Sequence, residues 1–256
     1  MSKISPKTVL KMASKKGKVN KKTELNEINL TEDNFSIEDL YLKEDKSNLE
    51  AYTNLKALLD SVCTCQVSDA YNAVARRSGV VKGLKSVNNH RVYGRIVTCD
   101  TNSDDWGTGL LAMDEAKEGE ILFLHSNGEP SAIWGELAST CAQEKGIAGC
   151  AVYGYLRDVD ITKYMDFPLF ALDLVPNAGI ALAYGKVNPE LNIDGRIIKP
   201  GDFLFGDESG VLIIPQETFK QVMLETLNIK VKEARILKLL KEGKSLSEIA
   251  GVKKEE

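Results

Sequence analysis

The chain has 256 residues, of which 43 % are hydrophobic and 7 % aromatic, enough apolar material for one domain of about 150–200 residues with appendages. Its 33 basic and 37 acidic side chains give a formal net charge of −4, a near balance that does not predict nucleic acid as the main partner. Apolar runs such as Ile121–Leu124 and Val211–Ile214 are too short to span a bilayer, and residues 1–20 lack the apolar stretch of a secretory signal. We therefore expect a cytoplasmic protein with no membrane segment.

The first fifty residues read as a charged N-terminal extension. Residues 1–22 hold eight lysines and no acidic residue, whereas residues 24–50 turn acidic. The basic stretch lacks the interleaved aromatics typical of single-stranded nucleic-acid binding, so a solvated tail is the favoured interpretation.

The remaining elements follow from hydrophobic periodicity and turn residues. Residues 49–65 carry apolar side chains at helical spacing, and a second helix is expected over 69–77 with Ser68 as its N-cap. Further helices are expected over 107–115, 132–145 and 217–241, and strands over 91–98, 121–125, 150–152, 169–171, 180–184, 203–205 and 211–214. This order predicts a layered α/β domain with mixed sheets over residues 51–215, followed by a helical segment over 216–256.

Five cysteines are scattered along the chain without paired spacing. An odd number in a chain of this size does not predict a disulfide framework, and buried reduced thiols are expected. They are Cys63, Cys65, Cys99, Cys141 and Cys150.

The segment Trp134–Ala138 lies where a helix is expected to begin. Amides at a helix N-terminus are unpaired and carry positive potential, so those of Leu137 and Ala138 could hold a carboxylate, with Gly135 permitting close approach. Glu136 would place an acid beside that anion. The residues alone favour a plainer role, in which Glu136 only complements the helix dipole.

A second candidate follows the buried strand at Cys150–Val152. Arg157 can bind a carboxylate through two hydrogen bonds, and Asp158 can supply a hard oxygen ligand. Both residues follow the carboxyl end of this strand, where α/β proteins build sites. A solvated ion pair is the plainer alternative. The acidic turn Gly206–Gly210 is interpreted as a hairpin turn between two strands.

Eight motifs stand in an order that resembles one known family, the RraA-like family. The similarity covers about 150 residues, from about Val67 to Pro215, and depends on order and spacing together. The motifs are Val67–Ala70, Gly94–Thr98, Ala116–Ile121, Gly135–Ala138, Gly146–Gly149, Gly154–Asp158, Phe167–Phe170 and Ile198–Val211.

The resemblance implies a β/β/α swivelling-type domain with a long C-terminal helix that assembles as trimers or hexamers with sites between subunits. Enzymes of the family include 4-hydroxy-4-methyl-2-oxoglutarate aldolase, and members also decarboxylate oxaloacetate. The implied function is therefore a divalent-metal-dependent lyase that acts on small 2-keto acids through a pyruvate enolate.

The same resemblance assigns roles by motif position. Asp158, with Glu136 acting through water, would hold Mg²⁺ or Mn²⁺, and Arg157 would bind the keto-acid carboxylate and the enolate oxygen. The substrate carboxylate would also meet the amides of Leu137 and Ala138 beside Gly135. An acid from the C-terminal helix of a neighbouring subunit is expected to contribute, and Glu233 is its nearest match.

One departure keeps a different reading open. The family's aldolases usually have Asp-Gly where this chain has Tyr153-Gly154, and Tyr-Gly resembles the noncatalytic branch that binds ribonuclease E. That branch tends to have Arg-Gln where this chain keeps Arg157-Asp158, so the retained carboxylate favours the metal site.

Two further relationships come with the family. A similar domain is fused to hexulose-6-phosphate synthase in some relatives, which would make this chain an accessory domain. The label demethylmenaquinone methyltransferase has also been attached to the family, but this sequence shows no glycine-rich S-adenosylmethionine loop after a first strand.

Overall fold

The computed structural model describes residues 49–252, which belong to two compact units. The larger unit is Cys63–Phe219; the smaller contains the described residues before and after it. The N-terminal extension expected over residues 1–50 lies, except for its last two residues, outside the described part of the chain.

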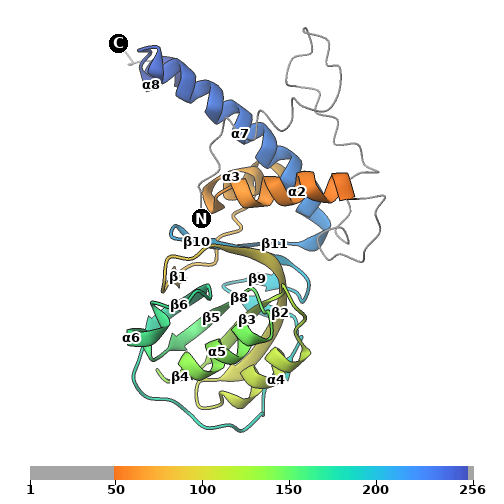
Figure 1. Ribbon diagram of the computed structural model, residues 1–256, viewed down its shortest axis with the longest axis vertical. Coiled ribbons are helices and arrows are strands. Elements are labelled where there is room, and N and C mark those ends of the chain that lie inside the picture. The colour runs from red at the N-terminus through yellow and green to blue at the C-terminus, as the bar shows by residue number, and fades with distance from the viewer. Residues whose placement is uncertain (1–48, 253–256) are drawn as a thin grey trace. The chain divides into compact units, whose positions relative to one another are not determined.

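A mixed sheet of nine strands forms the larger unit (Figure 1). Strands β2, β3, β5 and β6 run parallel in the centre, and antiparallel strands lie at both ends of the order β1-β6-β5-β3-β2-β10-β11. The two short strands β4 and β7 pair with β5 and β2 outside this order. The strands are β1 (Lys85–Ser86), β2 (Val92–Asn102), β3 (Ile121–Asn127), β4 (Ala132–Trp134), β5 (Gly149–Leu156), β6 (Leu169–Leu174), β7 (Lys186–Val187), β10 (Phe203–Asp207) and β11 (Gly210–Ile214).

The sheet is nearly closed, because the segment just before β1 reaches β11 through a bridge between Val80 and Leu212. This confirms the layered mixed α/β fold that the sequence predicts. Both β10 and β11, and the turn between them, also form where they are expected.

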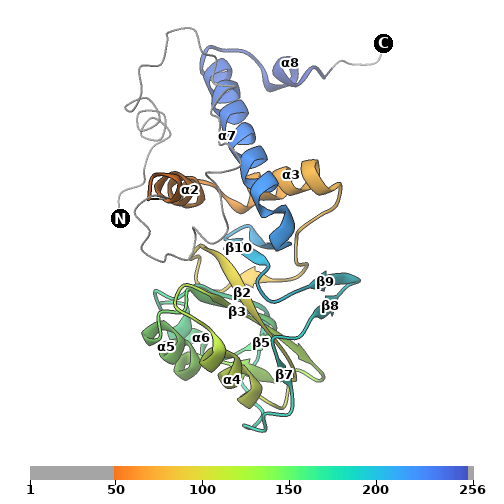
Figure 2. The same ribbon diagram turned by 90° about the vertical axis from the view of Figure 1, so that its right-hand side faces the viewer.

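Each face of the sheet is covered by different elements. Alternate residues point to opposite sides of a strand, so Leu122 and Leu124 face one core while Ile121 and Phe123 face another. The first core lies under helices α4 (Gly107–Glu115) and α5 (Glu136–Glu144), and the short helix α6 (Val159–Thr162) follows β5. The second lies under the separate hairpin of β8 (Leu191–Ile193) and β9 (Arg196–Ile198), which Figure 2 shows on the other side of the sheet.

Two helices precede the sheet, and the boundary between them differs from the prediction. Helix α2 (Leu49–Ser61) ends four residues early, and α3 (Thr64–Ala75) begins five residues early with Cys63 as its N-cap. Ser68 is therefore inside α3 and the N-cap prediction was wrong. The start is fixed instead by Asp207, whose carboxylate accepts bonds of 2.9 Å from the Thr64 amide and 2.6 Å from its hydroxyl.

The expected helix over 132–145 is also only partly correct. Its first three residues form β4, which pairs with β5 beyond the end of β3, and α5 begins after Gly135. The apolar run Ala132–Trp134 is buried on all sides as a strand, and a run this short has no periodicity that separates strand from helix.

The strand expected over 180–184 does not form. The amides of Leu182, Ala183 and Tyr184 donate to the buried carboxylate of Asp105 at 2.9–3.0 Å rather than to a neighbouring strand. The Asp105 carboxylate also accepts a 2.7 Å bond from the Thr108 hydroxyl, so it fastens this segment to the start of α4.

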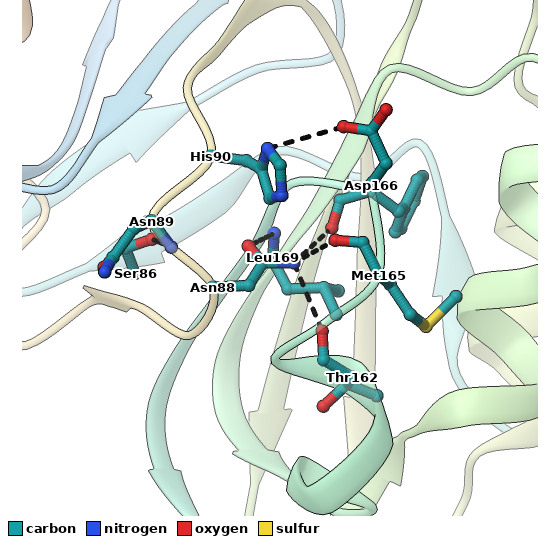
Figure 3. Close-up of polar contacts among 9 residues, drawn as sticks. Ser86, Asn88, Asn89, His90, Thr162, Met165, Asp166 and Leu169 are labelled. Carbon is teal, nitrogen blue, oxygen red and sulfur yellow. Dashed lines mark hydrogen bonds and ion pairs between the residues drawn. The ribbon is translucent and has the colours of Figure 1, made fainter.

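A side-chain amide organises the segment between α6 and β6 in a similar way (Figure 3). Asn88 Nδ2 lies within hydrogen-bonding distance of the carbonyls of Thr162, Met165 and Phe167, at 2.7–3.3 Å. Its Oδ1 accepts from the Leu169 amide at 3.2 Å, which fixes where β6 begins.

Most described residues of the smaller unit are helical. Helix α7 (Phe219–Lys241) confirms the long C-terminal helix, and α8 (Leu246–Ala250) follows with a capping box between Ser245 and Glu248. Within this unit the Lys230 ammonium donates to the Ser61 carbonyl at the end of α2, at 2.7 Å. None of the helices described is long and apolar enough to cross a membrane.

All five cysteines are free thiols. The expectation that they are buried holds for Cys99 and Cys150 only; Cys63, Cys65 and Cys141 are exposed. Burial raises the pKa of Cys99 to about 12, so this thiol is protonated and inert at neutral pH.

Candidate functional site

The two motifs that the sequence singles out meet at the carboxyl end of β5. Glu136 begins α5, and Asp158 follows β5 by two residues. The backbone amide of Glu136 donates to Asp158 Oδ2 at 3.1 Å, so residues 22 positions apart in the chain share one polar site.

Hydrogen bonds around the buried Trp134 fix the start of α5. The Trp134 indole donates to the Ser139 hydroxyl at 2.9 Å, and this hydroxyl donates to the Gly135 carbonyl at 2.8 Å. The Trp134 carbonyl in turn accepts from the Arg157 amide at 3.1 Å. Trp134 therefore connects the N-terminus of α5, through its side chain, to Arg157, through its carbonyl.

Gly135 is the point of closest approach between the two motifs. A Cβ atom at this position would lie 2.4 Å from Asp158 Oδ2 and 3.0 Å from Arg157 Cγ. Real Cβ atoms do not come this close to a carboxylate oxygen, so glycine is required for the carboxylate to reach the helix amide.

Asp158 adopts a left-handed backbone conformation, with φ 59° and ψ 37°. For a residue other than glycine this costs on the order of 1–3 kcal/mol and persists only where the surroundings enforce it. Asp158 is the N-cap of α6, yet its side chain makes no bond to that helix and turns to α5. The strained backbone therefore aims the carboxylate into the site.

Arg157 supplies the positive charge. Its Nε lies 3.5 Å from Asp158 Oδ2, and the two side chains are 42 % and 36 % exposed. At this exposure both groups are accessible to a ligand, and a partly exposed ion pair of this kind contributes little to stability.

The first turn of α5 offers further donors. Ser139 is the first residue whose amide reaches back to Gly135, at 3.0 Å, so the amides of Leu137 and Ala138 precede the first turn of the helical ladder. The Leu137 side chain is 80 % exposed, and Glu136 is partly buried. The structure thus brings Gly135, Glu136, Arg157 and Asp158 together, with the two predicted amides beside them.

Glu233, the remaining predicted site residue, lies on α7 in the smaller unit and is partly buried. Its contribution from a neighbouring subunit stays a prediction.

The donor set is sparse for a metal site. Among residues 49–252 no three His, Cys, Asp or Glu side chains are grouped to hold a metal ion, which disfavours a closed zinc site. Asp158 Oδ2 is engaged by Glu136 and Arg157, and within the described chain its Oδ1 makes no hydrogen bond. One available hard oxygen fits an ion such as Mg²⁺, which keeps several waters and completes its shell with substrate oxygens.

A row of polar side chains, not predicted as a group, crosses the face of the sheet that packs against the β8–β9 hairpin. Asp100, His125 and Tyr153 occupy matched positions on β2, β3 and β5. His125 Nδ1 lies 2.8 Å from Asp100 Oδ1, and the His125 and Tyr153 rings are 5.7 Å apart. Burial raises the pKa of Tyr153, and the nearby Asp194 carboxylate raises it further. Only the strand register reveals this row.

Tyr153, the departure from the aldolase motif, therefore lies within β5 and not at its carboxyl end with Arg157. Its side chain contacts His125 and Asp194. The substitution leaves Asp158 and its partners in place.

Comparison with known proteins agrees with this architecture. Residues 64–213, more than half of the chain, match the family model described as RraA-like, Aldolase/RraA. An uncharacterized protein of Methanocaldococcus jannaschii is 34 % identical over 174 residues, covering 66 % of this chain and 83 % of the relative. The 4-hydroxy-4-methyl-2-oxoglutarate aldolase of Thermus thermophilus is 32 % identical over 127 residues, covering 49 % and 77 %.

Solved structures give the same fold. An uncharacterized protein from Pseudomonas syringae superposes with a TM-score of 0.67 at 23 % identity, covering 77 % of this chain and 96 % of that one. The RNA-processing inhibitor RraA from Thermus gives a TM-score of 0.53 at 28 % identity, covering 58 % and 92 %. The family match, the fold and the order of the motifs lead to one conclusion: the chain belongs to the RraA-like family.

Proposed function

We propose that the protein is a divalent-metal-dependent lyase that cleaves or decarboxylates small 2-keto acids through a pyruvate enolate. The observation that carries the proposal is the contact between the Glu136 amide and Asp158 beside Arg157. It joins a carboxylate, a permanent cation and a helix N-terminus at one strand end. Relatives named as 4-hydroxy-4-methyl-2-oxoglutarate aldolase at about 30 % identity support the same class of reaction.

Substrate binding would use the two kinds of anion receptor in the site. Arg157 presents a planar guanidinium that suits a carboxylate. The amides of Leu137 and Ala138, at the positive end of α5, would bind the same carboxylate from the other side. Because these donors are backbone groups on a braced helix, they need no reorganisation when the substrate arrives.

Asp158 would hold Mg²⁺ or Mn²⁺, with Glu136 acting through water. Such a cation, when bound, stabilises the negative charge that develops on the keto oxygen in both retro-aldol cleavage and β-decarboxylation. Arg157 adds a second counter-charge at that oxygen, and Glu136 would accept or relay the proton released from the substrate hydroxyl. Neither reaction requires a Schiff-base lysine.

The test is pyruvate release from oxaloacetate and from 4-hydroxy-4-methyl-2-oxoglutarate by the full chain. Each reaction is run with Mg²⁺, with Mn²⁺ and with EDTA, beside enzyme-free controls at the same metal concentration. We expect turnover that EDTA abolishes and added metal restores. Turnover that persists in EDTA would reject the metal-dependent proposal.

A protein-binding role is the second candidate, and Tyr153 is the observation that favours it. Tyr-Gly at this position resembles the noncatalytic branch, and the RNA-processing inhibitor RraA from Thermus shares the fold. Under this reading the chain would bind ribonuclease or another protein partner without turnover. Saturable binding to purified ribonuclease E, together with no pyruvate release in any metal, would establish it in place of the lyase.

A further inference from the structure

A cavity of about 420 Å³ lies within the larger unit, away from the site described above. It is open to solvent and is lined by residues of the end of α3, the β8–β9 hairpin and β11. Neither Arg157 nor Asp158 lines it. Its volume is in the range of pockets that hold small organic ligands.

One wall of this cavity is apolar. Val81, Ile193, Ile198 and Ile213 line it and are themselves 0–5 % exposed. These side chains form part of the core beneath the hairpin, so the wall is rigid and would accept an aliphatic or aromatic ligand body.

Two arginines in the cavity lining are fixed in position. The Arg196 guanidinium donates to the carbonyls of Gly79 and Ser78, the latter at 2.5 Å. Arg77 Nε donates to the Tyr71 hydroxyl at 2.7 Å, and its guanidinium carbon lies 5.8 Å from the centre of the Tyr71 ring. Lys82 lines the same cavity.

The positive charges of Arg77 and Arg196 repel each other. Burial lowers the pKa of Arg196; the neighbouring Tyr71 raises it and the Arg77 cation lowers it again. A guanidinium stays protonated at neutral pH despite such effects, so two like charges are held in one partly enclosed space. An anion between them would relieve this repulsion.

Three acids, Asp194, Asp202 and Glu217, also line the cavity. The buried Asp202 carboxylate accepts from the amides of Lys199 and Gln216, at 2.9 and 3.1 Å. The Asp194 carboxylate raises the pKa of the neighbouring Tyr153. The Lys199 ammonium pairs with Glu190 at 3.4 Å. In the described chain none of the three lining carboxylates forms an ion pair with Arg77, Lys82 or Arg196, and the four cations of the lining outnumber its acids by one.

We propose that this cavity is a second ligand site, which binds a phosphate monoester with a small apolar body. The phosphate would lie between Arg77 and Arg196 near Lys82, and the apolar body would lie against Val81 and Ile213. Three cations favour a dianionic phosphate over a carboxylate of similar size.

Isothermal titration of the full chain with phenyl phosphate and with benzoate tests the proposal. We expect phenyl phosphate to bind more tightly than benzoate, and its Kd to rise about tenfold in Arg77→Ala and in Lys82→Ala because each removes a charge-assisted contact. Both residues are exposed, so neither substitution opens the core. The matched control Lys85→Ala, on an exposed lysine outside the cavity, should bind as the wild type does.

Arg157→Ala separates this site from the proposed lyase site, because phenyl phosphate should bind this variant with unchanged affinity whether or not the chain is a lyase. Failure of the wild type to bind phenyl phosphate would overturn the proposal. So would binding that is lost in Arg157→Ala but retained in Arg77→Ala, or binding no tighter than that of benzoate.

Discussion

Asp158 combines a strained backbone with a carboxylate shared between a helix amide and an arginine. Asparagine keeps the size of this side chain, tolerates the left-handed conformation and can still accept the Glu136 amide through its carbonyl oxygen. It removes only the negative charge. Asp158→Asn should therefore fold normally and bind Mn²⁺ about tenfold or more weakly, because ligand charge sets the affinity for hard cations.

Electron paramagnetic resonance of free Mn²⁺ during a titration measures this affinity. The matched control is Asp160→Asn, which neutralises an exposed carboxylate two residues along on α6. Equal Mn²⁺ affinity in Asp158→Asn and the wild type would show that Asp158 only caps α5.

Gly135 gives a second prediction at the scale of one residue. In Gly135→Ala the new methyl group would lie 2.4 Å from Asp158 Oδ2, so the carboxylate must leave the Glu136 amide. We expect loss of turnover and a loss of about 1–3 kcal/mol in the free energy of unfolding from overpacking. Urea denaturation and the pyruvate assay measure the two effects.

Gly109→Ala is the control for that substitution. Gly109 lies inside α4, where a Cβ would meet Leu124 at an ordinary contact distance of 3.5 Å. Alanine there should leave turnover unchanged and stabilise the helix slightly. If Gly135→Ala retained full turnover, the close approach of the two motifs would not matter for function.

At the scale of elements, the Asp105 carboxylate accepts the backbone amides of residues 182–184, which would otherwise need the partners of a neighbouring strand. Burial alone would raise the pKa of Asp105, but bonds from Thr108 and from the amides of Ala183, Tyr184 and Leu182 outweigh it and hold the pKa well below its ordinary value. A carboxyl group whose pKa is lower in the folded state stabilises the fold above its unfolded pKa of about 3.9. This contribution should be complete at neutral pH and disappear as the pH falls below about 4.

Asp105→Asn should lower the free energy of unfolding by about 3 kcal/mol at neutral pH, because an amide cannot accept all of these donors. The difference from the wild type should shrink as the pH falls below about 4, which urea denaturation across pH would show. The adjacent exposed Asp104→Asn serves as control. A difference that grows toward acid pH would contradict the assignment.

Elements with long, regular patterns could be predicted from sequence, and those set by distant partners could not. Helix Gly107–Glu115 forms over the predicted residues, and the β10–β11 hairpin forms around its acidic turn. The segment 180–184 has strand-like residues, but its amides bind a carboxylate 75 or more residues away. Local periodicity carries no information about such a partner.

The same distinction applies to the site. The sequence motifs identified Gly135 at a predicted helix start and Arg157 and Asp158 after a predicted buried strand, because both kinds of position can be recognised from the local sequence. The contact between them depends on β4 pairing with β5 beyond β3, and a three-residue strand has no detectable period. The row of Asp100, His125 and Tyr153 likewise requires the register of three strands.

At the scale of the whole molecule, the proposed lyase site depends on more than one chain. Sites between subunits, as the family resemblance implies, would make trimers or hexamers of the 28.1 kDa chain the active form. Sedimentation equilibrium should give a mass of three or six chains. A stable monomer with full turnover would contradict a shared site.

Mixed assemblies test which subunit supplies each acid. If Glu233 completes the site of a neighbour that provides Asp158, then Asp158→Asn and Glu233→Gln should each be nearly inactive alone. Assemblies formed by coexpressing the two variants should regain activity, because some sites receive both wild-type residues. Without recovery in proven mixed assemblies, Glu233 is not the acid supplied across the interface.

The most direct test of the central claim is the Mg²⁺-dependent kcat/KM for pyruvate release from 4-hydroxy-4-methyl-2-oxoglutarate in matched variants. We expect kcat/KM to fall about 100-fold or more in Arg157→Ala and in Asp158→Asn, the size expected when a charge that stabilises the transition state is removed. Wild-type values are expected in Asp160→Asn and Lys163→Ala, which change exposed charges on and just after α6. Wild-type turnover in Arg157→Ala and Asp158→Asn would contradict the account and place the chemistry elsewhere.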